Sequence, residues 1–323
     1  MTSKRNTNAK RTINDFDINF MGRRKLAAIL SGTALVVALL SILIRGFDFG
    51  LDFTGGTVIE VGYQEPAELS EVRQSLESQG FPGATIQYFG SNRDILIRLM
   101  PQAEEESSAE LSNRVFRALS QDAKGEVELR RVEYVGPQVG EELREQGGLA
   151  VLFSLIGILI YVALRFEWRF AVGAVAALVH DVLFTVGVFS IFQIQFDLTV
   201  LAAVLAVIGY SLNDTIVIFD RIRENFRRMR KGTVMEITNN SINQTLSRTI
   251  VTSGTTLLVL FALYLFGGEA ISGFSLALIV GIFVGTYSTI YVATAIVIWL
   301  GLSKADLIPV PVKKEGAELN SMP

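Results

Sequence analysis

Apolar residues divide the chain into six long hydrophobic runs, with one mainly polar region between the first two. The runs cover residues 26–44, 149–164, 170–192, 198–219, 246–266 and 274–300. A helix needs about 20 apolar residues to cross a bilayer, so each run is expected to form a transmembrane helix. The run over 149–164 is short for a span, so the pattern defines its ends poorly. The chain is therefore predicted to be a membrane α-helical bundle with six transmembrane helices.

The region between the first two runs changes to the short periods of a mixed α+β fold. Residues 57–63, 84–89, 94–99 and 126–135 read as strands, while residues 67–79 and 107–121 repeat apolar side chains at helical spacing. The order β-α-β-β-α-β is that of the split βαβ, ferredoxin-like fold. About 100 residues can bury a core of their own, so residues 45–146 are expected to form a separate domain.

Composition and charge place this domain outside the membrane. Half of the 323 residues are hydrophobic, and the absence of cysteine excludes disulfides and thiolate metal sites. Residues 46–146 contain 19 acidic and 9 basic residues, whereas basic residues flank the first run and follow the fourth. The short loops over 193–197 and 267–273 contain no Lys or Arg. The positive-inside rule therefore places both tails, 1–25 and 303–323, in the cytoplasm.

The first hydrophobic run could be confused with a secretory signal. Its polar leader is about 25 residues long, and no small-x-small cleavage pattern follows before Arg45. We therefore expect it to remain as an uncleaved membrane anchor.

The fourth run carries the most informative polar residues. Tyr210, Asn213 and Asp214 share one helix face at spacing i, i+3 and i+4. A carboxylate at membrane depth costs about 2.5 to 3.5 kcal/mol on insertion scales, and it is usually kept where it faces a bundle interior or a water path. These residues therefore indicate either an ion or proton site or a structural hydrogen-bond cluster between helices.

The start of the fifth run supplies a candidate counter-charge. Arg248, Thr252 and Thr255 share one helix face, and Thr256 lies on the adjacent face. Because the fourth and fifth helices are antiparallel, Arg248 is expected at a depth similar to that of Asp214, where each charge could compensate the other. The competing interpretation is an arginine that extends to the lipid headgroups.

The third run contains His180, the sole histidine of the chain, next to Asp181. His180 can be a hydrogen-bonded packing residue or an ionisable functional group. Asp181 is harder to assign to packing alone, because an unpaired buried carboxylate tends to become protonated.

The loop over residues 220–245 has an amphipathic pattern. Ile222, Phe226 and Met229 share one face among several arginines, which predicts a helix at the membrane interface. Thr233 and Glu236 form a capping-box pattern, which predicts the start of a second cytoplasmic helix.

Glycine and proline mark two further features. Gly136, Pro137 and Gly140 can form either a hinge or a fixed turn between the outer domain and the second transmembrane helix. In the sixth run, Gly281 and Gly285 share a face with Ser288 and predict close packing against another helix, within this chain or in a partner. The sequence does not decide whether this face packs against a helix of this chain or against a helix of a partner.

Several of these segments, taken in order, resemble the SecF family of the bacterial Sec export system. They are Leu-Asp-Phe-Thr-Gly-Gly-Thr at 51–57, Val-Gly-Pro at 135–137, Arg-Phe-Glu-Trp-Arg at 165–169, His-Asp at 180–181, Gly-Tyr-Ser-Leu-Asn-Asp-Thr at 209–215, Arg-Ile-Arg-Glu-Asn at 221–225 and the Arg-Thr segment from 248. The resemblance covers nearly the whole chain.

The resemblance implies a member of the RND superfamily in the bacterial cytoplasmic (inner) membrane. Such proteins act with SecD, which supplies a second six-helix half, and use the proton motive force to assist export at the SecYEG channel. The proton-relay roles of the family fall on Asp214 and Arg248. The resemblance also implies roles for Asp181 and for the hydroxyls of the fifth run. The residues expected to give polar support are Tyr210, Asn213, His180, Asp181, Thr252, Thr255 and Thr256.

The resemblance implies no enzymatic activity and no cofactor other than the coupled protons. The implied partners are SecD, SecYEG, YajC, the unfolded translocating polypeptide and membrane lipids, with no metal and no nucleic acid. Two alternatives are an RND-type exporter of lipids or small molecules and a non-transporting membrane scaffold. Against the exporter, a single outer domain of about 100 residues is small for enclosing a substrate tunnel.

Overall fold

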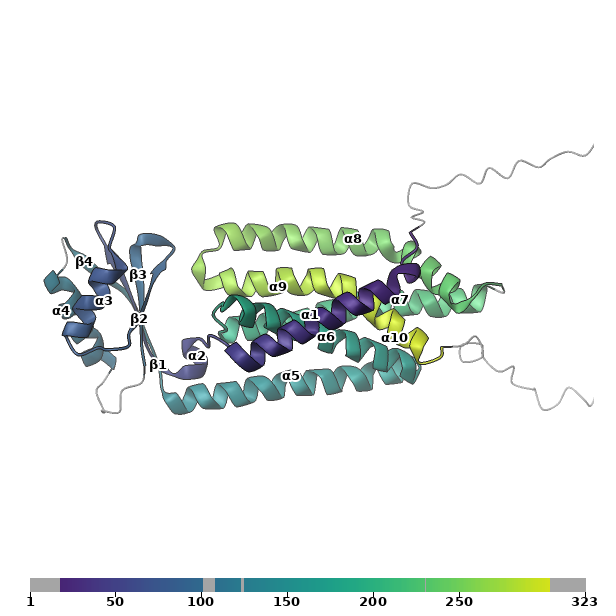
Figure 1. Ribbon diagram of the computed structural model, residues 1–323, viewed down its shortest axis with the longest axis horizontal. Helices are drawn as coiled ribbons and strands as arrows, with labels where there is room; N and C mark the ends of the chain where they lie inside the picture. Colours follow the sequence, from purple (N-terminus) through teal and green to yellow (C-terminus); the bar gives the residue numbers. More distant parts are fainter. Residues whose placement is uncertain (1–17, 101–107, 123–124, 230, 303–323) are drawn as a thin grey trace, which may run out of the picture.

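The computed structural model describes residues 18–100, 108–122, 125–229 and 231–302. It consists of a long helix bundle with a small α/β domain at one end (Figure 1). The first and last described residues lie at the opposite end of the bundle from this domain (Figure 1). Residues 1–17 of the predicted N-terminal tail and the whole predicted C-terminal tail, 303–323, lie outside the described residues.

The domain has the predicted ferredoxin-like order. Its elements are β1 (Gly56–Tyr63), α3 (Leu69–Ser78), β2 (Thr85–Phe89), β3 (Ser91–Leu99), α4 (Ser108–Asp122) and β4 (Val127–Val135). The sheet order is β2-β3-β1-β4, and every neighbouring pair is antiparallel. The α+β prediction is therefore confirmed, with each described boundary within about three residues of the expected one.

The core of the domain follows from the register of its central strands. Ile59 of β1 lies opposite Ile97 of β3 and Val132 of β4, so the three side chains share one face of the sheet. Ile59 and Ile97 are fully buried there, together with Leu76 of α3. Helices α3 and α4 cover this face, which closes a core independent of the membrane helices (Figure 1).

Six helical segments of the described chain are long and apolar enough to span a membrane. They are α1 (Arg24–Arg45), α5 (Pro137–Arg165), α6 (Trp168–Phe192), α7 (Leu198–Arg228), α8 (Val234–Phe266) and the continuous series α9 (Glu269–Ser288), η2 (Thr289–Ala293) and α10 (Thr294–Trp299). The segment η2 is π-helical, and a short 3-10 turn, η1 (Met21–Arg23), precedes α1. The predicted membrane α-helical bundle with six transmembrane helices is confirmed.

The helices differ in how deeply they are buried in the bundle. About half of the most apolar stretch is buried in α6 (44%), α7 (50%) and α9 to α10 (50%), against 17% in α1, 11% in α5 and 17% in α8. Helices α6, α7 and α9 are therefore central, and α1, α5 and α8 present most of their surface outward.

The predicted interfacial helix in the loop 220–245 is wrong. Helix α7 continues without a break to Arg228, and its side chains Ile222 and Phe226 are 1% and 2% exposed inside the bundle core. The apolar face thus packs against protein and not against lipid. The capping box of Thr233 and Glu236 is confirmed, but it begins the long helix α8 itself, not a separate cytoplasmic helix.

The second transmembrane helix begins 12 residues earlier than its apolar run suggested. Gly136 is the N-cap of α5, and Pro137 occupies its first turn, where a missing N–H is tolerated. A short helix, α2 (Leu51–Thr54), packs against this turn. A Cβ on Gly140 would lie 2.9 Å from the Gly55 nitrogen, so glycine is needed for this close approach. The packing favours a fixed turn over a hinge.

The segment over residues 48–52, which connects α1 to the domain, is also hydrogen-bonded to the loop between α6 and α7. The Gly50 N–H donates to the Phe196 carbonyl at 2.8 Å, and the Phe196 N–H donates to the Asp48 carbonyl at 2.7 Å. The Asp52 carboxylate accepts from the Leu198 N–H, which is the start of α7, at 2.9 Å. The chain segment leaving α1 is therefore hydrogen-bonded to the α6–α7 loop and to the start of α7.

Candidate functional site

Asp214 lies on α7 in the bundle interior, with 8% of its surface exposed. The Thr249 hydroxyl on α8 donates to Asp214 Oδ1 at 2.7 Å. The second carboxylate oxygen, Oδ2, is buried and has no hydrogen-bond partner among the described residues. Oδ2 of Asp214 can therefore accept a proton while Oδ1 keeps its hydrogen bond from Thr249.

Arg248 lies at the depth of Asp214, because it precedes Thr249 on α8, but it does not bind the carboxylate. Among the described residues, no ion pair within 4.0 Å joins Arg248 to Asp214. Successive residues on a helix point about 100° apart, so Thr249 faces α7 while Arg248 is exposed. The expected compensation between the two charges remains a prediction.

An exposed polar surface surrounds Arg248. We define the α7–α8 polar face as Asn213, Arg248, Thr252 and Thr255, all of which are exposed within helices that span the membrane. The hydroxyls of Thr252 and Thr255 bind backbone carbonyls of α8 itself. Polar groups at this depth are usually covered by protein or water, so this face is an unusual one to leave against lipid.

The remaining predicted residues of this region lie deeper along the same pair of helices. The Tyr210 hydroxyl on α7 lies 3.4 Å from the Thr256 hydroxyl on α8. This weak contact joins the two helices beside the α7–α8 polar face. The structure thus brings Tyr210 and Thr256 together but leaves Asn213 apart, on the exposed surface.

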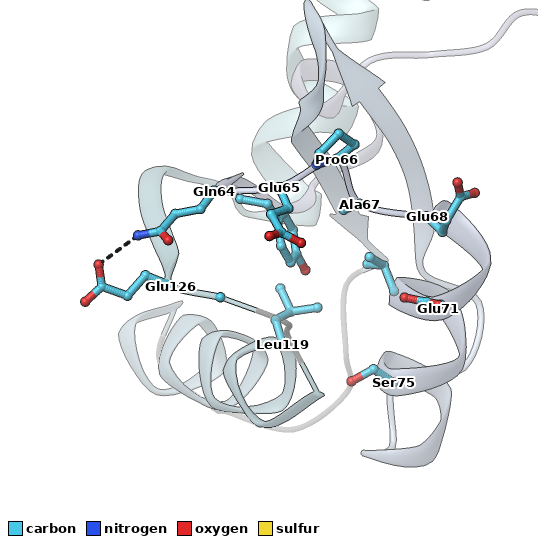
Figure 2. Close-up of a pocket in the computed structure, with 12 residues that line it drawn as sticks. Gln64, Glu65, Pro66, Ala67, Glu68, Glu71, Ser75, Leu119 and Glu126 are labelled. Atoms are coloured by element: carbon cyan, nitrogen blue, oxygen red, sulfur yellow. Dashed lines mark hydrogen bonds between the residues drawn. The ribbon is translucent and has the colours of Figure 1, made fainter.

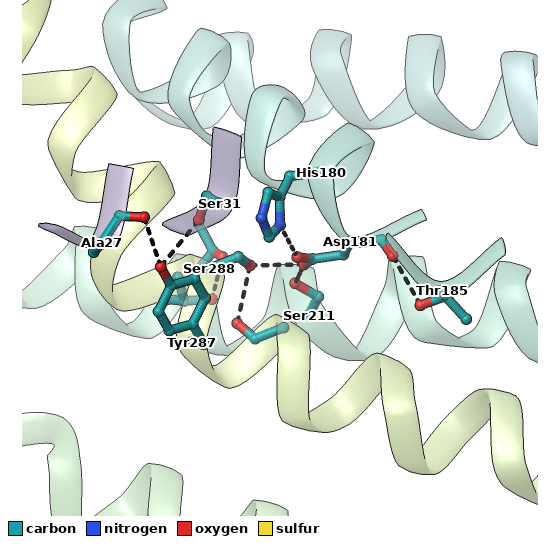
Figure 3. A network of polar contacts seen from close by, with 11 residues as sticks. Ala27, Ser31, His180, Asp181, Thr185, Ser211, Tyr287 and Ser288 are labelled. Carbon is teal, nitrogen blue, oxygen red and sulfur yellow. Dashed lines mark hydrogen bonds and ion pairs between the residues drawn. The ribbon is translucent and has the colours of Figure 1, made fainter. Parts of the chain in front are cut away.

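Asp181 is the centre of a second buried polar cluster, which Figure 3 shows. The Ser211 hydroxyl of α7 and the Ser288 hydroxyl of α9 donate to Asp181 Oδ2 at 2.6 and 2.8 Å. His180 Nδ1 lies 3.0 Å from Asp181 Oδ1. Asp181 is completely buried, and unlike Asp214 both of its carboxylate oxygens have partners. Sequence reasoning did not assign Ser211 or Ser288 to this carboxylate.

Small residues of α9 allow this cluster to form. A Cβ on Gly281 would lie 2.1 Å from a Val207 methyl group, and a Cβ on Gly285 would lie 3.1 Å from Ser211 Cβ. The predicted small-residue face therefore packs against α7 of the same chain. One turn further, the hydroxyls of Thr215 and Thr289 lie 2.9 Å apart. The sequence signal for these contacts was the pair Ser211 and Thr215, which lie on the same side of the apolar helix α7 as Asp214.

The outer domain has a cavity of about 120 Å³ between α3, α4 and the ends of β1 and β4 (Figure 2). Glu65, Glu68, Glu71 and Glu126 line it, and Gln64 Nε2 donates to Glu126 at 3.1 Å. Burial raises the pKa of Tyr63, which also lines the cavity, to about 12. Burial thus favours the neutral form of Tyr63.

Comparison with known families identifies two matching models. The family described as "Protein export membrane protein SecD/SecF, C-terminal" matches residues 115–303, and the "SecD/SecF GG Motif" matches residues 40–67. The chain is 56% identical over 297 residues to "Protein translocase subunit SecF" of Pseudomonas aeruginosa, covering 92% of this chain and 95% of that one. It is 53% identical over 306 residues to the subunit of the same name from Vibrio alginolyticus, covering 95% and 97%.

Two solved structures have the same fold. SecDF from Thermus thermophilus, described as a translocon-associated membrane protein, has a TM-score of 0.80 and 40% identity, and SecDF in the super-membrane-facing form has a TM-score of 0.67. The matches cover 90% and 88% of this chain but only 39% of each SecDF chain. The expectation that the chain is not an enzyme agrees with the subunit names. On sequence identity, coverage and fold together, the chain belongs to the SecF family of protein translocase subunits.

Proposed function

We propose that this protein-export subunit couples proton movement through its helix bundle to polypeptide translocation. In this proposal Asp214 carries the proton, and Arg248 is the cation that compensates the carboxylate in part of the cycle. The observation that carries the proposal is the buried Asp214 carboxylate with an unpartnered Oδ2. A proton can bind this oxygen while the hydrogen bond from Thr249 to Oδ1 is kept.

The α7–α8 polar face supports a partner that completes the site. Its four residues are exposed within membrane-spanning helices, which is costly against lipid. The chain corresponds to 39% of the matched SecDF chain, and the name of that chain joins SecD to SecF. We infer that a SecD-type second half covers the α7–α8 polar face and encloses Arg248 and Asp214 in one site.

The remaining partners and the orientation belong to the same proposal. Residues 48–52, at the base of the outer domain, are hydrogen-bonded to the α6–α7 loop and the start of α7. Through these contacts a movement of α6 or α7 can displace the outer domain. An unfolded polypeptide emerging from a SecYEG channel is the proposed cargo, with YajC as an accessory partner and lipids around the bundle. In this proposal both termini lie in the cytoplasm, which the positive loops support, and the protein lies in the bacterial inner membrane.

The test is proton-gradient-dependent export into inverted membrane vesicles that contain the chain and SecD. Asp214→Asn keeps the shape and the acceptor oxygen but carries no proton, so we expect the gradient-dependent part of export to be lost. Arg248→Met should impair it as well, because it removes the compensating charge. The matched control is Asp220→Asn on the same helix, an exposed residue that pairs with Arg165 at 3.2 Å.

The control should change export little, since an exposed ion pair contributes about 0 to 1 kcal/mol. Recovery of SecD with each variant shows that the complex still assembles. Gradient-dependent export that persists in Asp214→Asn would end the proposal for Asp214, whatever Arg248→Met does.

A further inference from the structure

The cluster around Asp181 has the hydrogen-bond pattern of an ionised carboxylate. The hydroxyls of Ser211 and Ser288 lie 2.6 and 2.8 Å from Oδ2, where both can donate to an ionised carboxylate. The other oxygen lies 3.0 Å from His180 Nδ1. If Asp181 is the acceptor throughout, Nδ1 carries a hydrogen and the lone pair of the imidazole is on Nε2. With the carboxylate ionised, the network therefore assigns the Nδ1–H tautomer to the ring.

His180 is 4% exposed, and it lies at the wall of a crevice. His180 lines a crevice of about 230 Å³ between α1, α6 and α9, together with Leu30, Ser31, Ala34, Phe184, Phe283, Val284 and Tyr287. Among the described residues, none makes a hydrogen bond to His180 Nε2. The two hydroxyls in the crevice are already used, since Tyr287 donates to the Ala27 carbonyl at 2.9 Å and lies 3.0 Å from Ser31 Oγ (Figure 3).

We propose that His180 and Asp181 form a second proton-binding site in the bundle, separate from Asp214. A hydronium ion gives its proton to the Nε2 lone pair and leaves as water. The imidazolium that forms is neutralised by the Asp181 carboxylate beside it, and release of the proton restores the neutral ring. His180 is the proton-binding residue, and Asp181 is the positioning residue that holds the ring and its charge.

The groups that face the ring favour this assignment. The titratable side chains that contact the ring or line the crevice beside it are Asp181 on α6 and Tyr287 on α9, and the crevice residues of α1 carry no charge. The one charged group in contact with the ring is Asp181, which is negative. No described cation lies within 4.0 Å of Asp181 to compete with an imidazolium.

Helix α7 contributes residues to both sites. Ser211, which donates to Asp181, is one helical turn before Asp214 on α7. Ser288 is the last residue of α9, and the π-helical segment η2 begins at Thr289, whose hydroxyl contacts Thr215. Single π-helical turns are often found at functional sites. A change of charge at His180 thus acts on Ser211, which lies three residues before Asp214 on α7.

The experiment uses the fact that the chain has one histidine. The full chain, labelled with ¹⁵N-histidine and placed in lipid nanodiscs, gives imidazole nitrogen signals from His180 alone. We expect the Nδ1–H tautomer at the upper end of a titration from about pH 8 to about pH 5, and conversion to imidazolium within it. A ring that stays neutral across this range, or that shows the Nε2–H tautomer, would overturn the proposal.

Two variants separate this site from the Asp214 site. Asp181→Asn should remove the conversion from the same range, because it deletes the neutralising charge. Asp214→Asn should retain it, and loss of the conversion in Asp214→Asn would show that the two groups are one site. This result does not depend on whether Asp214 itself carries protons during export.

The functional readout is gradient-dependent export. His180→Gln can still donate to Asp181 but cannot take up a proton in this range, so we expect the gradient-dependent part to be lost. Val179→Leu, one residue earlier on the outward surface of α6, is the matched control and should export normally. Unchanged export by His180→Gln, with the control also normal, would count against a role for this proton in transport.

Discussion

The tight contact between α7 and α9 gives a sharp test of how the bundle is packed. Gly281→Ala adds one methyl group that would lie 2.1 and 2.7 Å from the two methyl carbons of Val207. Valine has few alternative rotamers on a helix, so the contact can be relieved only by moving the helices apart. Overpacking of this kind costs about 1 to 3 kcal/mol.

The gain in helix propensity opposes this cost but is smaller than most of its range. Replacing a helical glycine by alanine contributes up to about 1 kcal/mol of helix propensity. Gly157→Ala on α5 is the matched control, because nothing lies within 4 Å of its added Cβ. We therefore expect Gly157→Ala to be neutral or mildly stabilising, and Gly281→Ala to be destabilising on balance.

The assay is reversible unfolding of the purified chain in mixed micelles, which gives the free energy of unfolding for each variant. A double-mutant cycle then isolates the contact, because Val207→Ala removes both methyl carbons that clash. Gly281→Ala should cost less in the Val207→Ala background than in the original chain. Equal costs in the two backgrounds, or a Gly281→Ala variant as stable as the original chain, would refute the packing argument.

Three further outcomes are expected. In this cysteine-free chain, Ser120→Cys should react with an impermeant maleimide from outside and Asn240→Cys only after permeabilisation, and same-side labelling would contradict the orientation. Thr249→Val removes the donor to Asp214 Oδ1 and should lower gradient-dependent export, whereas Thr249→Ser should retain it; equal export by the two variants would argue against this contact. Asn243→Leu removes two hydrogen bonds of 2.9 Å to the N–H and carbonyl of Ile18, and it should lower the free energy of unfolding by about 1 to 3 kcal/mol. Unfolding in mixed micelles measures this change, and an unchanged free energy would contradict the prediction.

The sequence predicts the elements of this protein because their signals are local. Length and hydropathy identify the membrane helices, and the alternation of apolar residues identifies the strands of the outer domain. The capping box at Thr233 was recognisable for the same reason, since both of its partners lie within four residues. Each of these features depends on neighbours in the chain.

A local pattern does not say what an apolar face will meet. Ile222 and Phe226 have the spacing of an interfacial helix, yet both are buried in the bundle core. The same period describes a helix that lies on lipid and a helix that lies on protein, because both need one apolar side. The choice depended on where α8 and α6 come to lie.

The candidate sites show the same division. The sequence was sufficient to find Asp214 and Asp181 as costly carboxylates in apolar helices, and to place Arg248 near the depth of Asp214. It did not supply the rotation that turns Thr249 inward and Arg248 outward. The tertiary structure alone gave Asp181 its partners Ser211 and Ser288, which lie 30 and 107 residues away in the chain. Those hydrogen bonds form because small residues let three helices approach closely, and the relative rotation of packed helices is a property of their contacts and not of any one segment.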